Sequence, residues 1–253
     1  MQKTYDLYKR GIAYWYLLLI PLIAWGFYQS YFSVLFQPRA NIIHLHFAFM
    51  MIWAAILITQ PLLIRYKKLP IHRAIGKVSY VVMPLLLITG FLMIRFVYYR
   101  DLNAVAGGEG LAEKPSAQKS QVVADSTRII ILYLFWLGFF YFRAILNRRI
   151  TSIHARYMVA ASLTMIGPTV DRILFFTFGI EKFFGTIPQE SLSYLLQDLI
   201  LAGLLIYDHK NGKPTKTLWI CLSVYIVGQV LYFFVKGKPF WETFVSFIMQ
   251  PAP

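Results

Sequence analysis

The chain has 253 residues, of which 58% are apolar and only 14% are charged, whereas soluble domains usually carry roughly 25% charged residues. This composition excludes an ordinary soluble domain and predicts an integral membrane protein. The formal net charge of +14 does not indicate nucleic-acid binding, because Lys and Arg occur in short clusters between long apolar runs. A single cysteine, Cys221, excludes an intrachain disulfide and a cysteine-rich metal site.

Seven apolar segments are long enough to cross a hydrocarbon core, which takes about 20 helical residues. The sequence therefore predicts an all-α bundle of seven transmembrane helices, forming one domain over residues 1–253. The expected spans are 12–36, 41–65, 76–98, 127–148, 155–178, 189–207 and 216–235. The first run is too long for the apolar part of a cleaved signal peptide.

The charge of the connecting segments predicts the orientation. Of the 25 Lys and Arg residues, 15 fall on the side that carries the N-terminus. Since positive charge concentrates on the cytoplasmic side, we expect the N-terminus in the cytoplasm and the C-terminus outside.

Two segments outside the spans differ in composition from the apolar runs. Residues 99–126 are small, polar and Gly-rich in part, which predicts a flexible external loop. Residues 239–253 carry aromatic residues at helical spacing, which predicts an amphipathic tail in the outer interface, with packing or anchoring as its role.

When the helices are threaded in alternating directions, the intramembrane polar residues fall into two layers. Charges at such depth are costly, so each layer is a candidate site. The outer layer contains His44, His46, Arg95, Asp171, Arg172 and Asp198. The inner layer contains Gln60, His72, Arg73, His154 and Arg156.

The histidines suggest three kinds of metal chemistry. His72 and His154 come from different helices, so one haem with two axial histidines is feasible on the inner side. His44 and His46 point about 200° apart on one helix and cannot share an iron, which disfavours a two-haem carrier of the cytochrome b561 kind. His46 and His154 each have a methionine four residues later, as copper would favour.

A zinc-dependent hydrolase is a further alternative. It would use His44 or His46 with Asp171 or Asp198 to hold a metal ion and a water molecule. No HExxH spacing accompanies these residues. The alternative for both layers is a structural role. Buried charges pair and fix helix register, and basic residues at the membrane boundary bind lipid phosphates.

Two motifs carry a resemblance. The first is His46, Gln60, His72-Arg73, Gly76 and Tyr80, and the second is His154, Arg156, Met158 and Arg172. Over residues 41–175 the chain resembles a family of predicted bacterial membrane proteins catalogued as a domain of unknown function. Members often have Trp before the Met of the second motif, where this chain has Tyr157. The resemblance implies a multi-pass protein of the bacterial cytoplasmic (inner) membrane and no agreed activity.

The sequence leaves the activity open, including whether the chain is an enzyme. The first hypothesis is a redox or metal-handling membrane protein, with His46, His72 and His154 as candidate ligands of haem, zinc or copper. A more distant likeness to proteins that assist haem-copper oxidase assembly adds to it by analogy only. The second is a non-enzymatic assembly or lipid-binding factor. Its expected partners are membrane lipids, a small apolar ligand or another membrane protein, and not nucleic acid.

Overall fold

The computed structural model describes residues 12–106 and 116–250, which are mainly helical and include one short hairpin. The elements at the start of the chain are α2 (Ile12–Trp15), η1 (Tyr16–Leu18), α3 (Leu19–Tyr28), η2 (Phe32–Val34), α4 (Asn41–Arg65) and α5 (Leu69–Ala106). The middle contains α6 (Ser116–Ser126), α7 (Arg128–Leu146), α8 (Thr151–Leu163), α9 (Ile166–Arg172) and a π-helical turn, η3 (Ile173–Thr177). The last part contains β1 (Lys182–Phe183), β2 (Ile187–Pro188), α10 (Glu190–Lys210), α11 (Lys216–Phe234) and α12 (Pro239–Met249).

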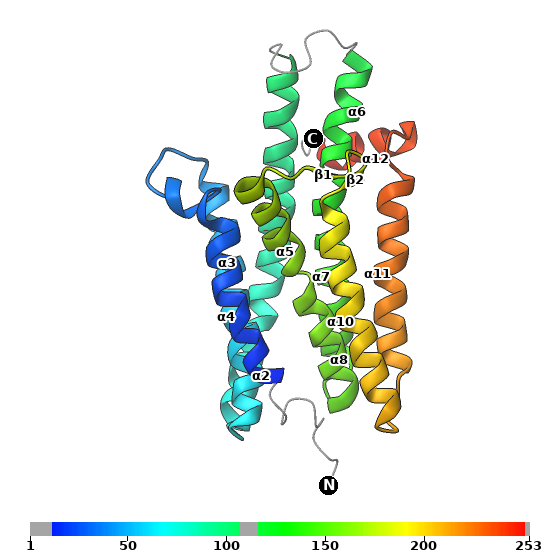
Figure 1. Cartoon of the computed structure of the whole chain (residues 1–253). Helices are drawn as coiled ribbons and strands as arrows, with labels where there is room; N and C mark the ends of the chain where they lie inside the picture. Colours follow the sequence, from blue (N-terminus) through cyan, green and yellow to red (C-terminus); the bar gives the residue numbers. More distant parts are fainter. Residues whose placement is uncertain (1–11, 107–115, 251–253) are drawn as a thin grey trace.

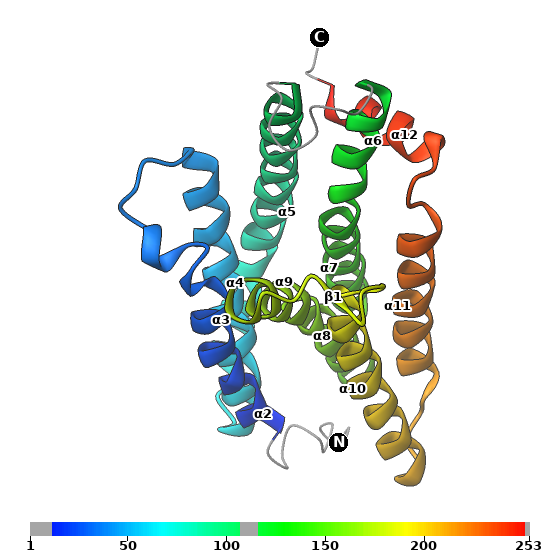
Figure 2. The same ribbon diagram turned by 45° about the horizontal axis from the view of Figure 1, so that its top comes forward.

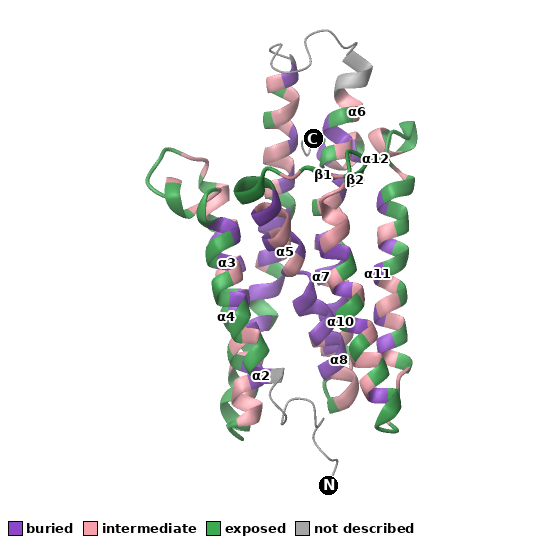
Figure 3. Cartoon of the chain, viewed as in Figure 1, coloured by how far each residue is buried: buried purple, intermediate pink, exposed green. Residues whose placement is uncertain are grey.

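Among the described residues, six helical segments are long and apolar enough to cross a membrane, so the chain is a multi-pass membrane protein of the all-α class. These segments are Asn41–Arg65, Leu69–Val105, Ser120–Leu146, Thr151–Thr177, Glu190–Lys210 and Lys216–Phe234. Large apolar side chains such as Phe142, Leu199 and Val230 are exposed on their outer faces. Figure 3 shows this exposed surface around a buried interior, as expected where lipid is the solvent.

The expected first span, 12–36, is not one helix. Its helical part, Ala13–Tyr28, is shorter than the six segments above. Beyond it the chain turns back over α4, because the Tyr31 ring stacks on Phe47 with centroids 3.7 Å apart. Arg39 Nη1 also donates to the carbonyl oxygen of Ser30 at 2.9 Å, which holds the turn closed.

The segment expected as a loop at 99–126 is largely helical where the structure describes it. Helix α5 continues to Ala106, and α6 begins at Ser116; residues 107–115 lie outside the described residues. Apolar side chains from α5, α6 and α12 form one buried cluster that includes Tyr98, Val123 and Met249. This packing explains why α5 and α6 extend into the segment that was expected to be a loop. It also gives α12, the helix of the predicted tail, a packing role.

The bundle has two distinct ends (Figure 1). We call the end with the start of α5 and the α7–α8 connection the basic end, and the end with β1, β2 and α12 the hairpin end. Helix α2 begins at the basic end and α12 lies at the hairpin end. Helices α4 and α5 pack together on one side, and α10 and α11 on the other.

The segment from α8 to η3 is the central one, since α9 contacts both α3 and α10 (Figure 2). It is interrupted between Leu163 and Ile166. A Cβ atom on Gly167 would lie 2.1 Å from Tyr133, and one on Gly26 would lie 2.7 Å from the Thr169 carbonyl oxygen. Glycine at these two positions therefore lets α7 and α3 approach α9 closely.

Candidate functional site

A cavity of about 650 Å³ lies at the basic end between the last turns of α4, the first turns of α5, and the α7–α8 connection. Its size falls in the range of about 300–1,000 Å³ that is typical of ligand sites. Apolar side chains form much of its wall, including Ile56, Leu57, Ile64, Ile145 and Met158. The cavity is therefore suited to a molecule with a substantial apolar part.

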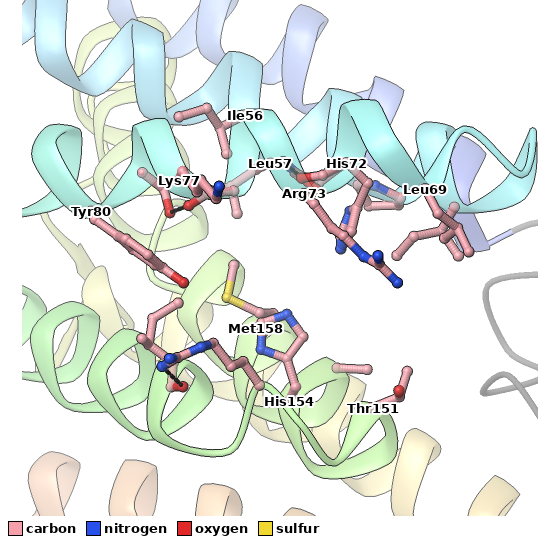
Figure 4. A pocket seen from close by; sticks show the side chains of 18 of the residues that line it. Ile56, Leu57, Leu69, His72, Arg73, Lys77, Tyr80, Thr151, His154 and Met158 are labelled. Atoms are coloured by element: carbon pink, nitrogen blue, oxygen red, sulfur yellow. Dashed lines mark hydrogen bonds between the residues drawn. The ribbon is translucent and has the colours of Figure 1, made fainter. Parts of the chain in front are cut away.

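Two histidines point into this cavity from opposite sides. His72 belongs to the first turn of α5 and His154 to the first turn of α8, and Figure 4 shows their rings projecting toward the same space. Both residues line this one cavity. Helices separated by about 80 residues of chain thus bring together the inner-layer histidines.

The hydrogen bonds of the two imidazoles differ. His154 Nδ1 lies 2.9 Å from the carbonyl oxygen of Ala144. Because that oxygen can only accept, Nδ1 carries the proton, and in the neutral ring Nε2 keeps a lone pair. His72 Nδ1 is buried and has no hydrogen-bond partner among the described residues.

The rim of the cavity is positively charged. Arg73 and Lys77 come from α5, and Arg148 and Arg149 come from the α7–α8 connection. None of the described residues that line the cavity is acidic. The four cations therefore have no carboxylate inside the cavity to neutralise them, and the site favours an anionic group.

The other two residues of the predicted inner site have separate roles. Gln60 lines the cavity and donates from Nε2 to the His72 carbonyl oxygen at 3.2 Å, so it joins α4 to α5. Arg156 does not line the cavity. It is 2% exposed and forms a salt bridge with Asp208 of α10, with 2.7 Å between Nη2 and Oδ2.

At the hairpin end the predicted outer site is divided. His44 Nδ1 lies 3.0 Å from the Tyr31 hydroxyl oxygen, whereas His46 Nδ1 lies 3.3 Å from Thr89 Oγ1 of α5. The two histidines thus face different neighbours, as their spacing predicted.

Asp171 and Arg172 also point to different helices. Asp171 Oδ2 accepts a hydrogen bond from the Tyr133 hydroxyl group of α7 at 3.1 Å. The Arg172 guanidinium group lies 4.6 Å over the Phe27 ring of α3, and it is close enough to His46 to interact electrostatically. The adjacent side chains of Asp171 and Arg172 therefore contact different helices, α7 and α3.

The remaining outer residues lie apart from these. Asp198 Oδ1 accepts from Gln229 Nε2 of α11 at 3.1 Å, and Arg95 has a buried Nε without a hydrogen-bond partner in the described part of the chain. The hydrogen bonds of His44, His46, Asp171 and Asp198 go to four different residues, so the six residues do not gather around one centre.

No group of three or more His, Cys, Asp or Glu side chains in the described ranges is placed to hold a metal ion. The zinc arrangement of His44 or His46 with Asp171 or Asp198 thus lacks a third His, Cys, Asp or Glu ligand among the described residues. His46 lies about three turns of α4 from Ile56, the nearest residue of that helix that lines the cavity with His72 and His154.

Compared with protein-family models, curated proteins and solved structures, the chain matches none.

Sequence reasoning did not assign Lys77, Arg148 and Arg149 to the inner site. A signal was present, since Lys77 follows Arg73 by four residues and shares its helix face. Tyr133 and Ser193, which surround Asp171, were also missed. A hydroxyl in an apolar helix is usually a helix-helix contact, so their pairing with a carboxyl needed the fold.

Proposed function

We propose that this chain is a redox membrane protein whose cavity at the basic end holds one haem, which His72 and His154 would bind through their imidazoles. The observation that carries the proposal is the convergence of these two imidazoles, from α5 and α8, on one largely apolar cavity. Imidazole pairs are established axial ligands of haem iron, and two ligands suffice.

The hydrogen bond of His154 supports this assignment. Histidines that bind metals generally donate their other ring N–H to a carbonyl or carboxylate group, which fixes the tautomer and the ring orientation. The Ala144 carbonyl oxygen accepts in this way from His154 Nδ1 at 2.9 Å. Nε2 is the nitrogen left for the iron.

The walls and the rim of the cavity suit the macrocycle and the propionates of a haem. A haem macrocycle is flat and largely apolar, and the side chains of Ile56, Leu57 and Met158 give the cavity an apolar wall. Its two propionates are carboxylates, which arginine binds well, and Arg73 and Arg148 lie at the rim. When bound with two histidines, such a group supplies one-electron transfer; the chain holds it, orients it and limits contact with water.

An absorption spectrum of the protein purified from haem-supplied cells tests the proposal. We expect a Soret band that is lost in His72→Ala and in His154→Ala. His44→Ala and His209→Ala are matched controls, because His44 bonds to Tyr31 at the hairpin end and His209 is exposed at the end of α10. Both controls should keep the band.

A wild-type spectrum without a Soret band would refute the haem assignment. Elemental analysis of the same sample distinguishes the alternatives among metals. Copper lost in His154→Ala and Met158→Leu would replace haem by a copper site, since Met158 lines the cavity four residues after His154. Stoichiometric zinc lost in His46→Ala would favour a hydrolase.

A second candidate function is the binding of an anionic lipid. It is favoured by one observation: four cations and no acidic residue among the described residues that line the cavity. Basic pockets at the membrane boundary bind phosphate headgroups. In this case native mass spectrometry should detect phosphatidylglycerol or cardiolipin on the wild type, and much less on the double variant Arg73→Gln/Arg148→Gln. Retention in His72→Ala would separate this function from haem binding.

We further propose a location in a bacterial cytoplasmic membrane with seven crossings, the first being Ala13–Tyr28, and with the N-terminus in the cytoplasm. The positions of α2 and α12 at opposite ends of the bundle support an odd number of crossings. The basic end carries the Arg and Lys clusters, which favours the cytoplasmic side. Membership of the family catalogued as a domain of unknown function is part of this proposal and rests on the two sequence motifs.

A further inference from the structure

A second cavity, of about 270 Å³, lies at the hairpin end of the bundle. Its walls come from the start of α7, from η3, from the β1–β2 hairpin, from the start of α10 and from the end of α11. Figure 1 shows the hairpin beside the start of α10 at this end. The cavity is smaller than the range of about 300–1,000 Å³ that is typical of sites for drug-sized ligands. It therefore suits a small group rather than a macrocycle.

The cavity lies at the level where membrane-spanning segments end. Three of the segments that are long and apolar enough to cross a membrane have an end here, namely Thr151–Thr177, Glu190–Lys210 and Lys216–Phe234. Phe175, Glu190 and Phe233 are each within two residues of one of these ends, and all three line the cavity. A cavity at this depth faces the headgroup region of a bilayer rather than its hydrocarbon core. Lipid headgroups are therefore the molecules that surround it.

Charged side chains of both signs line this cavity without pairing with one another. The cations are Arg128, Lys182 and Lys236, and the anions are Glu181 and Glu190. None of the salt bridges between described residues joins one of these cations to one of these carboxylates. Opposite charges that stay apart in one small cavity can both be satisfied by a single ligand that carries both signs.

Arg128 is the buried cation of this set. It is 7% exposed, and its guanidinium group lies 4.4 Å over the Tyr232 ring. Nε donates to the Asp125 carbonyl oxygen at 2.8 Å, and Nη1 donates to the Tyr232 carbonyl oxygen. Asp125 Oδ1 is 3.6 Å from Nε, which is beyond hydrogen-bond length. Nη2 has no acceptor in the described part of the chain, so it is left for a ligand, and guanidinium groups bind phosphate oxygens well.

Main-chain hydrogen bonds hold the two glutamates at the cavity. The Gln189 amide donates to the Glu181 carbonyl oxygen at 3.1 Å, which closes the base of the hairpin next to the start of α10. The Ile180 amide donates to the Leu174 carbonyl oxygen at 2.9 Å, which joins the hairpin to η3. Glu190 is in the first turn of α10, where the helix dipole stabilises a negative charge. Both carboxylates are thus placed to accept from an ammonium group.

The apolar part of the lining suits acyl chains. Phe175 and Phe233 line the cavity and are 43% and 45% exposed. Aromatic side chains are typical of the boundary between hydrocarbon and headgroups. Acyl chains attached to a headgroup in the cavity would lie against these two rings.

We propose that this cavity binds the headgroup of a phospholipid with a primary amine, of the phosphatidylethanolamine class. The phosphate oxygens accept from Arg128, Lys182 and Lys236. The ammonium group donates to Glu181 and Glu190. This site is independent of the haem assignment and of the anionic lipid at the basic end, because it lies at the other end of the bundle.

Native mass spectrometry of the delipidated full chain tests the proposal. The protein carries Arg73→Gln/Arg148→Gln, so that lipid binding in the basic-end cavity is weakened, and is titrated in detergent with phosphatidylethanolamine, phosphatidylcholine or phosphatidylglycerol. We expect one phosphatidylethanolamine to bind more tightly than the other two lipids. Choline has no N–H to donate, and the glycerol headgroup has no positive charge. Equal binding of the three lipids, or tighter binding of phosphatidylglycerol, would overturn the proposal.

Replacing the two lysines tests the phosphate contacts. Lys182 and Lys236 are exposed, so Lys182→Gln/Lys236→Gln should fold normally. We expect it to weaken phosphatidylethanolamine binding by roughly 30-fold, as two lysines near a membrane surface would. Lys238→Gln is the matched control, because Lys238 does not line the cavity and its Nζ lies 5.7 Å over the Phe234 ring. Equal affinities of the lysine double variant and this control would refute the phosphate contacts.

Replacing the two glutamates tests the ammonium contacts. Glu181→Gln/Glu190→Gln should remove the preference for phosphatidylethanolamine over phosphatidylglycerol while phosphatidylglycerol still binds. A preference that survives this change would contradict the role of the carboxylates. Soluble glycerophosphoethanolamine carries the same phosphate and ammonium groups without acyl chains. Much weaker binding of this compound supports a lipid, whereas binding as tight as that of phosphatidylethanolamine would overturn the lipid assignment in favour of a soluble ligand.

Discussion

Arg156 and Asp208 form a fully buried salt bridge between α8 and α10. Nη2 and Nε of the arginine lie 2.7 and 2.8 Å from Oδ2 of the aspartate, and the arginine also donates from Nη1 to the Ser152 carbonyl oxygen at 2.8 Å. The pair therefore fixes the two helices relative to each other beside the His154 side of the cavity.

Arg156→Ala is expected to destabilise the protein strongly. It leaves Asp208, which is 0% exposed, without its guanidinium partner, and breaking a buried pair typically costs about 3–5 kcal/mol. Thermal unfolding in detergent measures the effect. Arg100→Ala is the control, because Arg100 pairs with Asp101 at the surface with 57% of its side chain exposed. Equal melting temperatures for the two variants would contradict a structural role of the buried pair.

Gly167→Ala should lower stability and disturb Asp171. A Cβ atom 2.1 Å from the Tyr133 phenol group forces the ring away, and overpacking of this kind costs about 1–3 kcal/mol. Gly203→Ala in α10 is the control, since a Cβ atom there meets no atom within 4 Å; it should be neutral or stabilise by up to about 1 kcal/mol. If both variants melt alike, the close approach of α7 to α9 is not required.

Gln197→Leu should destabilise the kink between α8 and α9. Gln197 is 0% exposed and donates from Nε2 to the Leu163 carbonyl oxygen at 3.2 Å. Leucine has a similar volume but leaves this carbonyl unpaired, which costs about 1–3 kcal/mol. The midpoint of thermal unfolding reports the loss, and an unchanged midpoint would mean that the carbonyl finds another donor.

The orientation can be tested by cysteine labelling in a Cys221→Ser background. We expect Asn211→Cys, between α10 and α11, to react only with reagents that reach the cytoplasm. Phe184→Cys, in the β1–β2 hairpin with 93% of the native residue exposed, should react from outside. The reverse pattern would invert the proposed sidedness, and labelling of both from one side would contradict the membrane-spanning arrangement of α10.

Sequence patterns predicted the helical class and most spans because lipid imposes length and apolarity on each crossing helix. They also predicted that His72 and His154 share a layer, since alternating threading fixes depth. Rotation about each helix axis is not fixed by depth, and this is why Arg156 was assigned to a ligand site when it pairs with Asp208. Rotation about the helix axis also places Asp171 and His46 in different surroundings. The end of the first helical stretch at Tyr28 depended on the stacking of Tyr31 on Phe47, which no local pattern indicates.

The bond between His154 and the Ala144 carbonyl oxygen has a consequence for how this site can vary. Ala144 lies in the last turn of α7, which ends at Leu146. Carbonyl groups in the last turn of a helix have no N–H donor within that helix. A main-chain oxygen is retained whatever residue occupies position 144, so point substitutions there cannot abolish the acceptor. A one-residue insertion between Asn147 and Ile150 would instead shift the imidazole away from it. The hydrogen bond that orients the His154 ring therefore depends on the length of the α7–α8 connection. A natural change in that length would change the chemistry of the ring.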